Sequence, residues 1–180
     1  MSHAQRVLSV ALVLGLAPLL VQAQAPPPLR PPAVPLVAHD PYFSVWSATD
    51  RLADSGTRHW TGKPNSLSAL VRADGKTYRL MGRDRQPVPA LEQTGLEVLP
   101  TRTIYRFAGA GMEIELTFLT PALPDDLDVL ARPLTYVDFR VSSSDGQTHE
   151  VALYFEASSD VVVNTTDQQV ASTRLRLDGQ

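Results

Sequence analysis

The chain has 180 residues, a length that suits about one folded domain. Apolar residues make up 43% and charged residues 19%, which excludes a disordered or collagen-like chain. The formal net charge is −3 without a basic block, so nucleic acid is not an expected partner. Cysteine is absent, which excludes disulfide bonds, thiolate metal sites and a thiol nucleophile.

The first 23 residues have the pattern of a secretory signal peptide. Arg6 supplies a positive start, an apolar run covers Val7–Val21, and Ala23 provides the small residue before the cleavage site. The apolar run is about 15 residues long, short of the roughly 20 that a membrane-spanning helix requires. We therefore expect a secreted or periplasmic protein with no membrane attachment after cleavage.

Residues 24–36 are rich in proline, which fixes φ and removes backbone donors. This composition predicts an extended, polyproline-like linker with no core of its own. The remaining residues, 37–180, are then expected to form one β domain.

Apolar and polar residues alternate along most of that domain, which is the pattern of half-buried β-strands. Between two such runs, Asp74-Gly75 predicts a tight two-residue turn. The longest candidate helix, Asp125–Ala131, lies between two prolines and has room for two turns at most. Strands are expected within residues 42–47, 67–73, 76–81, 96–99, 103–107, 112–118, 137–141, 151–155, 160–163 and 170–177. Strands at this spacing predict an all-β fold, an antiparallel β-sandwich.

Two connections near the carboxyl end bear on how the sandwich closes. Residues 137–141 and 151–155 are expected to pair as a hairpin through the polar stretch that separates them. The strand at 170–177 is followed by Asp178-Gly179, a hairpin turn with no returning strand after it. This pattern predicts a domain that is incomplete at its carboxyl end, with an edge strand at 170–177 that can associate with another chain.

The residues that most often carry chemistry form no recognisable catalytic or metal-binding pattern. Asp125, Asp126 and Asp128 lack the glycine and distal glutamate of a calcium loop, so turn carboxylates are the favoured interpretation. His39, His59 and His149 have no ligand spacing and are interpreted as surface or hydrogen-bonded loop residues. We therefore predict no catalytic residue, no metal and no cofactor in this chain.

Three aromatic residues, Tyr42, Trp46 and Trp60, are the candidate binding residues. Planar aromatic rings stack on sugar rings when they are exposed, so exposed rings here would form a glycan platform. Tyr42 and Trp46 are expected to share one face of a strand, where packing in the core explains them equally well and is the favoured interpretation.

Several short strings of the sequence are informative through their order and spacing. These strings are HDPYFSVW (39–46), HWTG (59–62), LVRADGKTY (70–78), MG (81–82), PTRT (100–103), LTFLTP (116–121), PDDL (124–127), RP (132–133), SDG (144–146) and VALYF (151–155). Together they resemble the opening of the glutaminase A family, and the resemblance covers about residues 36–165.

The resemblance implies a secreted protein in which an amino-terminal β-sandwich precedes a larger, helical domain like an α/α-barrel. It also implies a parent activity that hydrolyses L-glutamine to L-glutamate and ammonia. No catalytic residue of the family maps onto these 180 residues, so we expect a non-catalytic sandwich whose partner is the downstream helical domain. The alternative is an accessory or carbohydrate-binding sandwich of a secreted enzyme similar to glycoside hydrolases, acting on a glycan instead of a small molecule.

Overall fold

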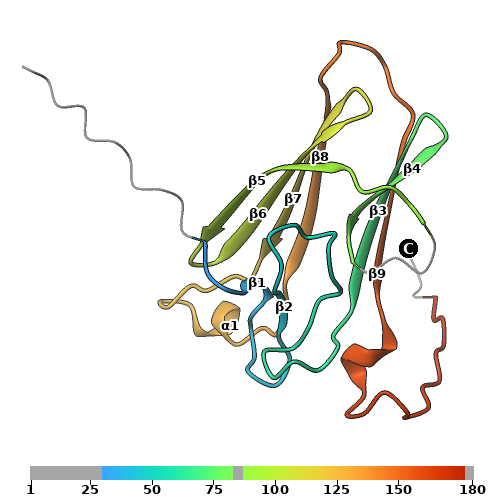
Figure 1. Ribbon diagram of the computed structural model, residues 1–180. Coiled ribbons are helices and arrows are strands. Elements are labelled where there is room, and N and C mark those ends of the chain that lie inside the picture. Colours follow the sequence, from blue (N-terminus) through green and yellow to red (C-terminus); the bar gives the residue numbers. More distant parts are fainter. Residues whose placement is uncertain (1–29, 83–86, 177–180) are drawn as a thin grey trace, which may run out of the picture.

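The computed structural model of the protein describes residues 30–82 and 87–176. Most of this part of the chain forms β-strands arranged as two facing antiparallel sheets, so the predicted all-β sandwich is confirmed (Figure 1). The predicted signal peptide, residues 1–23, lies outside the described residues. Among the described residues, no helix has the length and apolar character that crossing a membrane requires.

One sheet has three strands and the other has four. The three-stranded sheet has the order β4-β3-β9, with β3 at Leu67–Ala73, β4 at Lys76–Met81 and β9 at Val151–Ala157. The four-stranded sheet has the order β5-β6-β7-β8, with bounds Glu92–Leu99, Arg102–Gly109, Met112–Leu119 and Tyr136–Ser143. The described part of the chain also contains two short helices, α1 at Leu127–Leu130 and the 3₁₀ helix η1 at Ser159–Val162.

A separate small sheet pairs β1 (Val34–Val37) with β2 (Val45–Ser47). The last residues of the proline-rich segment therefore differ from the predicted linker, because Val34 and Leu36 are buried in the core. Proline is tolerated at Pro35 because this sheet has only two strands and therefore no central position. The folded domain thus begins a few residues before the boundary predicted from composition.

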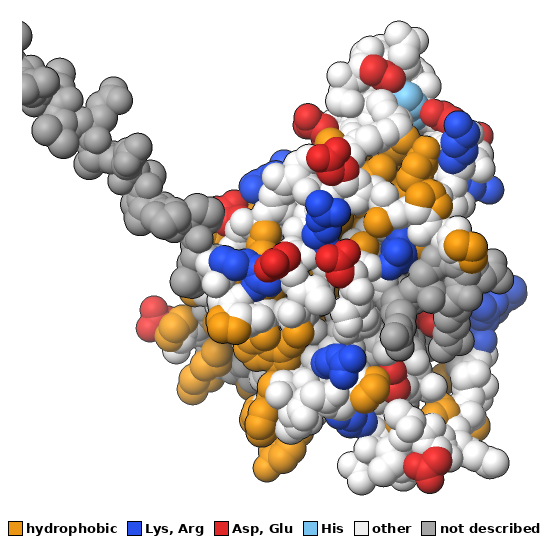
Figure 2. Space-filling view, viewed as in Figure 1, with side chains coloured by type: hydrophobic (Ala, Val, Ile, Leu, Met, Phe, Trp, Pro, Cys, Tyr) orange, Lys and Arg blue, Asp and Glu red, His pale blue; other side chains and the backbone are white. Residues whose placement is uncertain are grey.

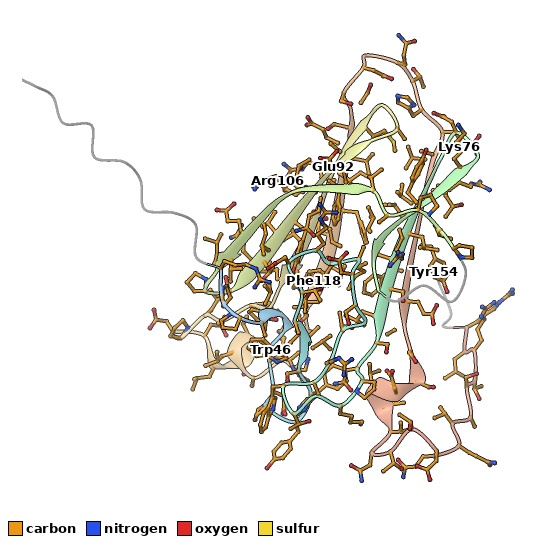
Figure 3. All side chains as sticks on the ribbon, in the orientation of Figure 1. Trp46, Lys76, Glu92, Arg106, Phe118 and Tyr154 are labelled. Carbon is orange, nitrogen blue, oxygen red and sulfur yellow. The ribbon has the colours of Figure 1, made fainter. Side chains whose placement is uncertain are left out.

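The strongest alternating pattern of the sequence forms β7, as predicted. Met112, Ile114, Leu116 and Phe118 are at most 2% exposed, while Glu113 points to the opposite, outer face. Phe118 lies between the two sheets in Figure 3. One hydrophobic cluster joins residues of both sheets and of β1 and β2, so a single core holds the sandwich together. Its largest fully buried side chains are Tyr105, Phe107, Phe118, Leu52, Leu80, Met81, Met112, Ile114 and Leu116.

The turn between β3 and β4 also follows the prediction. Asp74 and Gly75 have φ angles of 49° and 82°, and Ala73 pairs with Lys76 across the turn. Positive φ at both central residues is the geometry of a type I′ turn, which matches the twist of the flanking strands. Lys76 therefore stands at the tip of this hairpin (Figure 3).

The predicted hairpin between residues 137–141 and 151–155 is wrong. β8 pairs with β7, whereas β9 pairs with β3 in the other sheet, so the connection at 144–150 crosses from one sheet to the other. Alternation identifies strands but contains no information on which strand lies beside which.

Two strand predictions near the carboxyl end are also wrong. Residues 159–162 form the 3₁₀ helix, in which the Ser158 hydroxyl accepts from the Asp160 backbone N–H. Residues 170–176 form no regular secondary structure and belong to no sheet, and all of them are exposed. A strand needs a neighbour to satisfy its backbone, and among the described residues this segment has none.

The difference between buried and exposed leucines allows a direct test of the core. Replacing Leu116, which is fully buried in β7, by alanine should cost about 2 to 5 kcal/mol of stability because it leaves a cavity. The matched control is Leu127→Ala, since Leu127 is 73% exposed and its loss should change stability by about 0.5 kcal/mol or less. Urea unfolding followed by circular dichroism measures both. Equal effects of the two variants would contradict this core.

Candidate functional site

Three turns meet at one end of the sandwich around the side chain of His149. Its Nδ1 lies 2.7 Å from Oδ2 of Asp74 in the β3–β4 turn, and its Nε2 lies 3.0 Å from Oδ1 of Asp145 in the β8–β9 connection. The third turn brings Gly111 so close that a Cβ there would lie 2.4 Å from Oδ2 of Asp145. We call His149, Asp74 and Asp145 the histidine clasp.

The clasp joins the two sheets. Asp74 closes the β3–β4 hairpin of one sheet, whereas Asp145 follows β8 of the other. The backbone supports the same junction, because the Glu150 N–H donates to Asp74 Oδ1 and the Ser144 N–H donates to the Gly111 carbonyl. The clasp therefore fixes the connection that carries the chain from β8 to β9.

The two carboxylates of the clasp favour the protonated form of His149. Its side chain is only 11% exposed and each ring nitrogen faces a carboxylate, an arrangement that is best satisfied by the imidazolium form. Hydrogen bonds to Asp74 and then to Asp145 raise the pKa of His149 above its usual 6.5. The hydrogen bond from His149 lowers the pKa of Asp74, and the Gln147 backbone N–H is the largest cause of the lowered pKa of Asp145.

A cavity of about 380 Å³ opens beside the clasp. It is lined by Met112, Val141, Ser142, Ser143, His149, Val151 and Leu153. Serine and histidine in one cavity suggest nucleophilic catalysis, but a general base needs a ring nitrogen that can accept a proton. Both nitrogens of His149 are engaged by carboxylates, and the Ser143 hydroxyl donates to Asp145 instead of to His149. The arrangement is therefore suited to holding turns together and not to acyl transfer.

Two of the three predicted aromatic residues, Tyr42 and Trp60, lie on loops near β2. His59 Nε2 and Trp60 Nε1 both lie within hydrogen-bond distance of the Pro41 carbonyl oxygen, at 3.0 and 2.8 Å, which places the turn after His59 against the chain before Tyr42. Tyr42 is 92% exposed and Trp60 is 64% exposed. These two side chains therefore present exposed rings on neighbouring loops.

Trp46 behaves differently from the other two. It lies in β2, is partly buried, and its indole N–H donates to the Ser44 hydroxyl. Tyr42 is not on the same strand, because Asp40 Oδ1 accepts from the backbone N–H groups of Tyr42 and Phe43 and bends the chain there. The expectation that Tyr42 and Trp46 share a strand face is therefore not met.

The acidic cluster before α1 has a local role. Asp126 Oδ1 accepts a hydrogen bond from the Val129 N–H and caps the helix. Within residues 30–82 and 87–176, no group of three histidine or acidic side chains is arranged to hold a metal ion.

The three histidines have different surroundings. His39 stacks on Phe43, His59 contacts the Pro41 carbonyl, and His149 is clasped by two carboxylates. Sequence reasoning missed the clasp because 75 residues separate Asp74 from His149. The only local signal was the Asp145-Gly146 turn four residues before the histidine, and that pattern gives no information about Asp74.

The class of protein is thus an antiparallel β-sandwich whose sheets are tied at one end by an ionic clasp. Two domain families of unknown function match the chain, DUF4964 over residues 7–93 and DUF5127 over residues 101–179. No solved structure matches it.

Two curated relatives give the family a name. The chain is 33% identical to glutaminase A of Aspergillus oryzae (strain ATCC 42149 / RIB 40) over 141 residues, which are 74% of this chain and 20% of the relative. It is 30% identical to a probable glutaminase of Arthroderma benhamiae (strain ATCC MYA-4681 / CBS 112371) over 134 residues, 64% of this chain and 16% of that relative. The chain belongs to the glutaminase A-like family, and it spans about a fifth or less of the length of these relatives.

The clasp predicts how stability depends on pH. A raised histidine pKa contributes stability that is complete below 6.5 and is lost as pH rises through the folded value, whereas lowered carboxyl pKa values contribute stability that is lost as pH falls below 3.8. The clasp therefore stabilises the fold most between these two values. His149→Gln should lower the urea midpoint more at about pH 5 than at about pH 9.

The matched control is His59→Gln, because His59 contacts a carbonyl and a hydroxyl instead of carboxylates. A His149→Gln penalty that is the same at both pH values would show that the clasp is not ionic.

Proposed function

We propose that this chain is a non-catalytic β-sandwich region of a secreted glutaminase A-like hydrolase. In this proposal another part of the polypeptide hydrolyses L-glutamine to L-glutamate and ammonia, and the sandwich supports that part. The family match supports the parent activity, since a relative is named glutaminase A. The predicted signal peptide at residues 1–23 supports secretion.

The observation that carries the proposal is an exposed apolar surface around α1. Leu123, Leu127, Leu130 and Tyr136, which we call the α1 patch, are between 45% and 73% exposed. None of the residues of α1 is buried, although two of its four are leucines. Hydrophobic side chains gather at the lower left of the face shown in Figure 2, toward the end of the molecule that carries α1. Contiguous exposed apolar surface of this kind marks an interaction site.

The order of this segment does not come from burial. Asp126 caps the helix, and the Thr120 and Thr135 hydroxyls hydrogen-bond to each other at 2.8 Å where the segment leaves β7 and enters β8. The leucines are therefore held in place before anything covers them, which lowers the entropic cost of docking. Further polypeptide of the longer family members is the partner that we propose for the α1 patch.

The proposal predicts that the 180-residue chain releases no ammonia from L-glutamine. The measurement is an ammonia assay of the purified chain beside the Aspergillus oryzae enzyme as the positive control, at equal molar concentration. Turnover by the chain alone, lost on heating and proportional to its concentration, would overturn the accessory role.

A carbohydrate-binding role is the second candidate, and the exposure of Tyr42 and Trp60 favours it. Each exposed ring that stacks on a sugar should contribute about 1 kcal/mol, so Trp60→Ala should weaken retardation in a polysaccharide affinity gel about fivefold. Trp46→Ala is the matched control, since Trp46 is partly buried and should affect folding more than retardation. Unchanged migration of the wild type in gels that contain soluble polysaccharides would exclude this role.

A further inference from the structure

β9 has an unpaired edge. It is the last strand in the order β4-β3-β9, and no strand within residues 30–82 and 87–176 pairs with its other side. The register shows which backbone groups are free: Asp74 N–H donates to the Glu150 carbonyl and Ser158 N–H donates to the Ser66 carbonyl. The backbone N–H and C=O groups of the even-numbered residues of β9 therefore point toward β3. The backbone groups of Val151, Leu153, Phe155 and Ala157 point away from β3, toward the open edge.

The side chains on this edge are incompletely buried. Leu153 is 44% exposed and Phe155 is 38% exposed, although their alternation is that of an inward-facing set. Phe155 contacts Phe139 of β8 edge-on, with ring centroids 6.3 Å apart, so both residues lie where the two sheets meet. The inward side chains of β7 are therefore fully covered, whereas those at the edge formed by β8 and β9 are partly exposed to solvent.

β9 also lacks the features that keep edge strands apart. Such strands are protected by lysine, proline or several charges, and β9 contains one charged residue, Glu156, and no proline. β8 is the other edge of this opening and carries Asp138 and Arg140. The unprotected edge is therefore β9.

We propose that β9 pairs with β9 of a second copy of this chain, antiparallel and about a two-fold axis at Tyr154. This register places Leu153 opposite Phe155 of the other copy, and Val151 opposite its Ala157. All four are the residues whose backbone groups point outward, so each pair can exchange two hydrogen bonds. The three-stranded sheets of two copies would then form one continuous sheet.

The two faces of β9 are compatible with this pairing. On the inner face, each Leu153–Phe155 pair joins an aliphatic and an aromatic side chain, a combination that stabilises neighbouring strands. On the outer face Tyr154 lies opposite its own copy, and Glu156 lies opposite Ala152, so no like charges face each other. The Tyr154 hydroxyl already donates to Glu156 Oε2 at 2.7 Å within one chain, which fixes both side chains beside the axis. Tyr154 lies on β9 in Figure 3.

The test uses the 180-residue chain and one charge at the axis. Tyr154→Lys places two lysines opposite each other in the pair, while within one chain the new lysine lies beside Glu156. Sedimentation velocity over a range of concentrations should show a dimer for the wild type, and an association at least about tenfold weaker for Tyr154→Lys. Tyr42→Lys is the matched control, because Tyr42 is 92% exposed on a loop outside β9 and its substitution should leave the dimer intact.

Amide hydrogen exchange distinguishes the possible occupants of the edge. In the dimer the amides of Val151, Leu153 and Phe155 should be protected at high concentration and should exchange faster on dilution. A wild type that stays monomeric with these amides unprotected would overturn the proposal. Protection in a monomer would also overturn it, because a segment of the same chain would then cover the edge. A dimer that Tyr154→Lys and Tyr42→Lys leave equally strong would place the interface elsewhere. The ammonia assay is independent of all these outcomes.

Discussion

The structure depends on a single hydrophobic layer between two sheets that are sealed unequally at their edges. On one side, β1, β2 and the following loop close the layer with Val34, Val45 and Leu52, which are fully buried. On the other side β8 and β9 continue the same alternation, yet their inward residues are only partly covered. This asymmetry separates the stable body of the domain from the surface that is available to partners.

The crossing between the sheets makes polar contacts necessary at both ends of β9. At its beginning, the histidine clasp and the Glu150–Asp74 hydrogen bond tie the incoming connection to the β3–β4 turn. At its end, Asp160 accepts from the Ser66 N–H and hydroxyl at 2.8 and 2.6 Å. β9 obtains little stability from burial, so these contacts and its ladder with β3 hold it in register. Polar residues that resemble a catalytic set can thus serve a structural purpose where a strand changes sheets.

The sequence predicted what depends on neighbours along the chain. The alternation in β7 and the Asp74-Gly75 turn are local, and both were identified within a residue of their observed positions. The partner of β9 and the clasp around His149 depend on residues about 75 to 90 positions away, and alternation does not encode such pairings. Residues 170–176 show the converse, since a strand-like pattern remains outside any sheet when no neighbour satisfies its backbone. Tyr42 lies outside the strand that contains Trp46 because the Asp40 side chain accepts a hydrogen bond from the Tyr42 N–H and bends the chain there. The alternating pattern did not predict this bend.

The two apolar surfaces of the domain differ in the kind of contact that each can make. In the α1 patch the hydrogen bonds of the helix and the Asp126 cap engage the backbone, so the leucine side chains are the groups presented to a partner. Along β9 the unsatisfied groups belong to the backbone itself, and the exposed side chains accompany them. Side-chain surfaces accept partners of many secondary structures, whereas a free strand edge selects another strand. In the two proposals made above, α1 would therefore dock a folded region through its side chains, whereas β9 would pair with a strand through its backbone.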